Sequence, residues 1–258
     1  MYPVVAVIHL AGVCPLAWAF RANRQTTLPH ALGWTGAAWL AWGVVFVNAW
    51  RRPEELSVGA SYLALALTGC AGMAVLGARR PGVIAWNFVV AGLLAVLLLP
   101  LAEGWGEPKL GLLRTGFLAV TVLVVPFNYL PTRFGLAALL LAAGSGIELA
   151  RMMPYTGMSE LKTLDSLVVW GRVLVAISPW VAWGLMKGRR RPLSEFDRLW
   201  LDFRDRFGLS WTLRLREQFN RAAANAGWSV HLGWSGLQGQ GGEEMISTLR
   251  ALLKRFDW

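Results

Sequence analysis

The stretch DSLVVWGRVLVAISPWVAWGLMKGRRRP, from Asp165 to Pro192, decides the fold class of this chain. Between Asp165 and Lys187 the only charged residue is Arg172, and nearly all the others are apolar. A membrane-spanning helix needs about 20 mainly apolar residues, because the hydrocarbon layer is about 30 Å thick and each helical residue rises about 1.5 Å. The stretch therefore predicts a membrane-spanning helix that is followed by a cluster of positive charges.

Six other stretches have the same apolar character. With 165–187, the predicted spans are 4–20, 31–50, 56–77, 82–102, 110–130 and 133–150. The composition agrees, since 55% of the 258 residues are hydrophobic and long stretches carry no charge. No positive residue precedes the first stretch, so we interpret it as a retained helix and not as a signal peptide. The predicted fold class is all-α, a polytopic membrane helix bundle with about seven transmembrane helices.

The charge distribution predicts how the bundle is oriented. Sixteen of the 25 Lys and Arg residues lie in the membrane half, 1–191, against seven of the 15 acidic residues. Positive residues in short loops mark the cytoplasmic side, and the cluster at 187–191 is the densest. We therefore expect the N-terminus outside and the C-terminus in the cytoplasm. A nucleic-acid-binding face would instead gather these charges on the soluble part, so no nucleic-acid partner is expected. Arginine greatly outnumbers lysine, which would suit a GC-rich bacterial genome, and we expect a multi-pass protein of the bacterial inner (plasma) membrane.

Arg172 is the residue that needs an explanation, because an arginine at the bilayer centre costs about 3 kcal/mol on insertion scales. Asp165 precedes it by two helical turns on the same face, and Arg172 leans toward that outer end. Glu148 lies near the outer end of the preceding span, and Arg114 flanks a connection on the same side. These four residues form a candidate intramembrane polar cluster. Three interpretations stay open: an ion pair that locks the sixth and seventh helices, a site for an anion or carboxylate, or an arginine that faces lipid headgroups.

Two rows of small residues predict which helices are central. They are Ala60, Ala64, Thr68 and Gly72 in the third span, and Ala138, Ala142, Gly146 and Ala150 in the sixth. Small residues at four-residue spacing let helix backbones approach closely in a membrane, where no hydrophobic force drives association. We expect these two helices at the centre of the bundle.

Residues 192–258 are predicted to form a cytoplasmic tail domain that is mainly helical. Ser194 can cap a first helix that stops at Gly208, and Ser210 can cap a second that ends at Gly227. The charged residues of these helices are expected on a solvated, salt-bridged face. The four tryptophans Trp200, Trp211, Trp228 and Trp234 form a candidate interaction surface. A tail of this size makes a marginal core by itself, so we expect it to pack on the membrane domain or on a protein partner.

The end of the tail allows several arrangements. Residues 228–235 alternate like a single strand with no partner in sight, and the glycines of 236–242 predict a flexible linker. Residues 243–256 have one apolar side. They can form the third helix of a small core, lie on the inner leaflet, or dock into a partner.

Motifs for common membrane chemistry are missing from the sequence. Haem ligation within a membrane usually needs a pair of histidines, and His9 is the only histidine inside a predicted span. A retinal-binding lysine would lie at the middle of the seventh helix, whereas Lys187 lies at its end. There is no His-Glu-x-x-His pattern, no phosphate-binding loop and no Gly-x-Ser-x-Gly elbow. Cys14 and Cys70 are expected to be small apolar fillers. The sequence therefore predicts no cofactor, no metal and no catalytic residue.

Three functions follow from these observations. The first is a non-catalytic scaffold, assembly or regulatory subunit that lies in the lipid bilayer and binds a protein partner through its tail. The second is a transporter or channel for a small anionic solute that uses Arg172. The third is a membrane enzyme that acts on a lipid-linked substrate near Glu148, Asp165 and Arg172.

Overall fold

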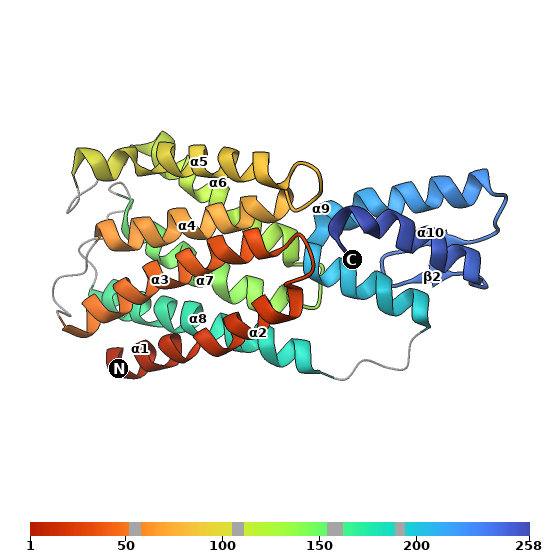
Figure 1. The fold of residues 1–258 in the computed structure, drawn as a ribbon. Helices are drawn as coiled ribbons and strands as arrows, with labels where there is room; N and C mark the ends of the chain where they lie inside the picture. The colour runs from red at the N-terminus through yellow and green to blue at the C-terminus, as the bar shows by residue number, and fades with distance from the viewer. Residues whose placement is uncertain (52–57, 105–110, 154–161, 189–193) are drawn as a thin grey trace.

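The chain folds into a bundle of long apolar helices with a smaller helical unit at one end (Figure 1). The computed structural model describes residues 1–51, 58–104, 111–153, 162–188 and 194–258, with only the helix backbone described for 162–165. The bundle helices are α1 (Tyr2–Ala11), α2 (Val13–Asn23), α3 (Pro29–Arg51), α4 (Val58–Leu76), α5 (Val83–Glu103), α6 (Leu112–Tyr129), α7 (Gly135–Arg151) and α8 (Lys162–Lys187).

The described part of each of the seven predicted spans is mainly helical, and six of these stretches are long and apolar enough to cross a membrane. Among the described residues, the stretches long and apolar enough to cross one are Tyr2–Asn23 (α1 with α2), α3, α4, α5, α6 and Ser166–Lys187 of α8. The exception is α7, which has 17 residues and ends in Glu148 and Arg151. The chain is thus mostly helical and compatible with a multi-pass membrane protein, but the predicted count of seven spans is not confirmed. The side on which each terminus lies remains a prediction.

The first span is broken just before Pro15. Pro15 has no N–H to donate to the carbonyl of Ala11, so the helical hydrogen-bond pattern fails there. The structure accordingly separates α1 from α2 at Gly12.

The centre of the bundle is α4. In its apolar stretch 78% of the residues are buried, against at most 33% in the other five candidate spans. This confirms the prediction drawn from its small-residue row. The row predicted for α7 is wrong in its details, because Gly146 is exposed. The close approach of α7 is made by Gly144, where an added Cβ would lie 2.4 Å from the Gly171 carbonyl of α8.

The tail consists of α9 (Glu195–Asn225), a short hairpin of β1 (His231–Leu232) and β2 (Leu237–Gln238), α10 (Glu243–Leu253) and a 3-10 turn (Lys254–Phe256). Ser194 caps α9 by accepting a hydrogen bond from the Asp197 N–H at 3.1 Å. Gly208 interrupts α9 as predicted, but the chain continues as a kinked helix. Near the other end, Gly227 follows α9 with φ +70°.

The end of the tail differs from its predicted form. The strand of 228–235 has a partner after all, because β2 lies within the segment 236–242 that was predicted to be a linker. Among the three alternatives for 243–256, the structure has the first, since Leu249 and Leu253 of α10 are fully buried in the tail core. The other fully buried apolar side chains of the tail are Trp200, Phe203, Phe207, Phe219 and Leu232.

Candidate functional site

The predicted polar cluster contains one buried ion pair between two helices. Arg172 of α8 donates from Nε to Oε1 of Glu148 in α7 at 2.6 Å, and the two residues are 1% and 0% exposed. The pair lies beside the closest contact of these helices, because Gly144 is one turn before Glu148 and Gly171 precedes Arg172. Without a side chain at either glycine, the backbones come close enough for a short arginine-to-glutamate bond.

Two further groups surround the pair. Oε2 of Glu148 lies 3.4 Å from Nη2 of Arg151, one turn along α7. On the other side, the guanidinium of Arg172 lies 5.9 Å from the ring centre of Tyr2 in α1, within the distance of a cation–π interaction. Among the described residues, Nη1 of Arg172 has no hydrogen-bond partner. The Glu148 carboxylate thus lies between two arginines of α7 and α8, and α1 contacts one of these arginines.

The other members of the predicted cluster are not part of this pair. Arg114 is paired with Glu103 through two bonds of 2.6 and 2.8 Å, at the exposed connection between α5 and α6. The side chain of Asp165 lies outside the described residues. The observed arrangement is the first of the three interpretations of Arg172, an ion pair that joins the sixth and seventh predicted spans.

Replacing Gly144 by alanine is expected to destabilise the bundle, because the new Cβ would meet the Gly171 carbonyl at 2.4 Å and a methyl of Val175 at 2.7 Å. Gly146 on the same helix has nothing within 4 Å, so alanine there is expected to be neutral or stabilising by up to about 1 kcal/mol through helix propensity. Thermal unfolding of the two variants in detergent measures the difference. Equal unfolding temperatures would show that the α7–α8 contact is looser than described.

A second site, which sequence analysis did not identify, joins the tail to the bundle at the kink of α9. Gly208 has φ 75° and ψ −168°, so the helix breaks there. A break leaves a carbonyl before it and an N–H after it without helical partners. Asn128 of α6 supplies both, since Nδ2 donates to the Phe207 carbonyl at 3.3 Å and Oδ1 accepts from the Ser210 N–H at 3.1 Å. One bundle side chain therefore completes the hydrogen bonding of a tail helix.

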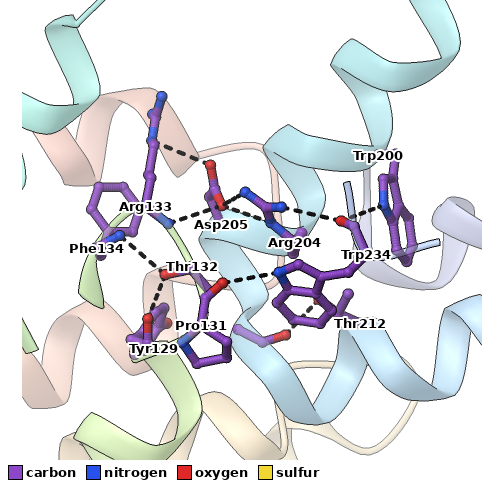
Figure 2. A network of polar contacts seen from close by, with 11 residues as sticks. Tyr129, Pro131, Thr132, Arg133, Phe134, Trp200, Arg204, Asp205, Thr212 and Trp234 are labelled. Atoms are coloured by element: carbon purple, nitrogen blue, oxygen red, sulfur yellow. Dashed lines mark hydrogen bonds and ion pairs between the residues drawn. The ribbon is translucent and has the colours of Figure 1, made fainter. Parts of the chain in front are cut away.

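Next to the kink, Asp205 forms a buried charge network with the α6–α7 connection (Figure 2). Its side chain is 1% exposed and accepts bonds from Nε and Nη2 of Arg204 at 3.0 and 2.8 Å. Its other oxygen lies 3.4 Å from Nε of Arg133. The expectation that the charges of these helices lie on a solvated face is wrong for Asp205. A buried carboxylate needs such partners, because an unpaired charge away from water is costly.

Trp234 extends this network to the hairpin (Figure 2). Its indole Nε1 donates to the Pro131 carbonyl at 3.0 Å, so it reaches the same connection of the bundle. Its own carbonyl accepts from Nη1 of Arg204 at 3.1 Å and from Nε1 of Trp200 at 3.3 Å. The tail core, the hairpin and the bundle are thus linked through consecutive hydrogen bonds.

Other parts of α9 contact two more bundle helices, α2 and α4, and contact α6 again. Trp211 donates from its indole to the Val75 carbonyl of α4 at 3.1 Å. Tyr129 of α6 donates to the Arg206 carbonyl at 2.9 Å, and Arg206 donates to Oδ1 of Asn23 in α2 at 3.2 Å. Contacts to α2, α4 and α6 from consecutive turns fix the direction of α9 as well as its position.

Residues 255–257 bind the bundle mainly through hydrogen bonds between main-chain groups. The Thr27 N–H donates to the Phe256 carbonyl at 3.1 Å, and the Arg80 N–H donates to the Arg255 carbonyl at 2.9 Å. Arg80 and Asp257 also form an ion pair at 2.8 Å. The C-terminal turn therefore bridges the α2–α3 and α4–α5 connections.

The four tryptophans of the predicted interaction surface are mostly engaged within the chain itself. Trp200 is fully buried and Trp211 is 6% exposed. Trp234 is bound to Pro131, and Trp228 is half-buried. In this conformation, Trp200, Trp211 and Trp234 are packed or hydrogen-bonded within the chain.

The chemistry of these two sites is structural pairing and hydrogen bonding. In the described part of the chain, no three His, Cys, Asp or Glu side chains are grouped as metal ligands. Comparisons of the chain with protein-family models, with curated proteins and with solved structures find no match.

Proposed function

We propose that this chain is a non-catalytic membrane scaffold or regulatory subunit whose bundle holds the tail in one fixed orientation at the cytoplasmic surface. In this role the bundle anchors the chain in the membrane, and the outward surface of the tail binds a protein partner. The partner surface is formed by the exposed outer side of α9 and α10, since three of the four tryptophans that first suggested a surface are packed or hydrogen-bonded within the chain.

The bond set of Asn128 carries this proposal. A tail that did not pack on the bundle would have to satisfy the hydrogen bonds of its helices by itself. In this chain, the side chain of Asn128 in the bundle bonds to the main chain of α9 on both sides of Gly208. Buried groups that are fully hydrogen-bonded favour one arrangement over others, because each lost bond leaves an unsatisfied polar group that costs about 1–3 kcal/mol. Such a docked tail is suited to present a surface at a defined distance from the membrane.

The positive end of the bundle supports the cytoplasmic side. The connections 24–28, 77–82 and 130–134, which lie on the tail side of the bundle, contain four arginines and no acidic residue. Short positive loops remain on the cytoplasmic side during insertion.

Site-specific photocrosslinking in living cells tests the proposal. A photoreactive amino acid is placed at Arg198, Leu213 or Arg221, which are exposed on the tail, and at Phe88 or Leu113, which are exposed on the bundle. We expect the tail positions to give a common protein adduct and the bundle positions to give lipid adducts. If no tail position yields a protein adduct while the bundle positions react, the scaffold function is ruled out.

A further inference from the structure

A cavity of about 380 Å³, partly open to the outside, lies in the bundle on the side of the tail. Its wall is formed by α1, α2, α3, α4, α6, α7 and α8, and two residues of α9 line one end. Most of the lining is apolar, including Leu16, Leu32, Trp39, Ala138, Val175 and Pro179. Its volume is within the range of roughly 300–1,000 Å³ that is typical of small-molecule sites.

Such a space is not expected to stay empty or to fill with water. Protein interiors are close-packed, and their few voids are seldom larger than a water molecule. An engineered apolar cavity of about 150 Å³ that is fully enclosed already binds benzene or xenon, and the partly open cavity of this chain is larger. Water needs two to four polar partners to be stable, which a mainly apolar wall does not provide. A hydrocarbon group fits the wall.

The tail end of the same cavity is charged. It is lined by Arg133, Arg206 and Asp205. Asp205 is also paired with Arg204, which does not line the cavity, at 2.8 Å. The balance at this end is therefore positive, and it faces the end of the bundle that also carries the exposed Arg21 and Arg24.

From this combination we propose that the cavity binds an anionic phospholipid of the surrounding bilayer. One acyl chain occupies the apolar part between α2, α3, α7 and α8, and the headgroup phosphate lies beside Arg133 and Arg206. Charge complementarity selects the headgroup, since phosphate oxygens accept charge-assisted bonds from guanidinium groups. The depth of the apolar wall selects a lipid over a soluble anion, because a free anion has no apolar part to bury. The bound lipid would contact α9 and the bundle at once.

The experiment uses the purified full chain in detergent and two photoactivatable lipids with the same diazirine-bearing acyl chain. One is phosphatidylglycerol, which is anionic, and the other is phosphatidylcholine, which is zwitterionic. Adducts are mapped by mass spectrometry of peptides. We expect phosphatidylglycerol adducts on cavity-lining residues such as Leu16 and Ala138, with weaker labelling by phosphatidylcholine. Adducts confined to exposed positions such as Leu136 and Leu139, or equal cavity labelling by both lipids, would overturn the proposal.

Variants of one helix separate the cavity from the outer surface. Ala138→Phe places a ring in the cavity, whereas Ala143→Phe places the same ring on the exposed face of α7. We expect the first to abolish cavity adducts and the second to keep them; persistence of cavity adducts in a folded Ala138→Phe protein would contradict the assignment. If Ala138→Phe does not fold, the positions of the lipid adducts on the unaltered chain decide whether the lipid lies in the cavity.

The headgroup site has its own matched pair. Arg133→Gln removes a charge at the cavity end, and Arg24→Gln removes an exposed charge that does not line the cavity. Loss of one charge-assisted bond corresponds to about tenfold in affinity, so we expect Arg133→Gln to lower cavity labelling by phosphatidylglycerol about tenfold. Arg24→Gln should leave it unchanged. Equal labelling of the two variants would remove Arg133 from the site and, with it, the proposed headgroup position.

Discussion

Arg172→Met is expected to lower the free energy of unfolding of the bundle by about 3–5 kcal/mol, because it leaves Glu148 as a buried carboxylate without its closest partner. Glu148→Leu should have an effect of similar size, since it leaves the buried guanidinium unpaired. The measurement is chemical or thermal unfolding of the detergent-solubilised chain. Both effects are expected to be large because Glu148 and Arg172 are 0% and 1% exposed.

The double variant Glu148→Leu with Arg172→Met distinguishes a structural pair from a functional one. Replacing both buried ions by apolar groups of similar size is often neutral or stabilising, so stability should return toward that of the unaltered chain. The exposed pair Arg114–Glu103 is the control, and Arg114→Met should change stability little because solvent screens it. If Arg172→Met unfolds like the unaltered chain, the pair is not a lock. The interpretation of Arg172 as an anion site would then be favoured.

Gly208→Ala is expected to release the tail from the bundle. The φ of 75° with ψ of −168° lies in a region that is essentially restricted to glycine, and other residues pay about 1–3 kcal/mol there. The added Cβ would also lie 2.8 Å from the main-chain oxygen of Asn128, which belongs to the rigid end of α6. Hydrogen exchange should therefore increase at the amides of 205–212 and at 24–28, where the C-terminal turn binds.

Gly227→Ala is the control that separates the effect of backbone strain from the effect of the clash with Asn128. Gly227 also has a positive φ, +70°, but nothing lies within 4 Å of an added Cβ. Alanine there should loosen the end of α9 without faster exchange at 24–28. If Gly208→Ala and Gly227→Ala change exchange in the same way, the contact with Asn128 does not hold the tail.

Much of the fold was accessible from the sequence because it depends on local patterns. Apolar stretches long enough to cross a membrane predicted the positions of the bundle helices, and the break in the first lies just before Pro15. Ser194 and Gly208 marked the start and the kink of α9 through their local backbone chemistry. The count of seven spans is not confirmed at α7, where the helix is only 17 residues long and ends in charged residues.

The site was accessible only in part, because it depends on contacts between distant residues. The pairing of Glu148 with Arg172 could be predicted, since a short connection joins their helices and a buried charge needs a partner. The role of Asn128 could not, because its partner Ser210 is 82 residues away and the register between them is set by the whole bundle. The only signal was an asparagine near the end of an apolar span and a glycine inside an amphipathic helix. Asp205 gave no signal, since acidic residues among arginines are usually solvated.

The measurement that most directly tests the docked tail is disulfide formation between Arg80→Cys and Arg255→Cys in native membranes, with Cys14 changed to serine. The Arg80 N–H binds the Arg255 carbonyl at 2.9 Å, and both side chains are exposed, so the two cysteines would be close and accessible to an oxidant. Arg80→Cys with Arg221→Cys is the control, because Arg221 lies near the far end of α9 (Figure 1). We predict rapid, nearly complete formation of the first disulfide and little of the second, seen by mass spectrometry of the joined peptides. Equal formation of both, or formation of neither, would contradict a tail that is held at the end of the bundle.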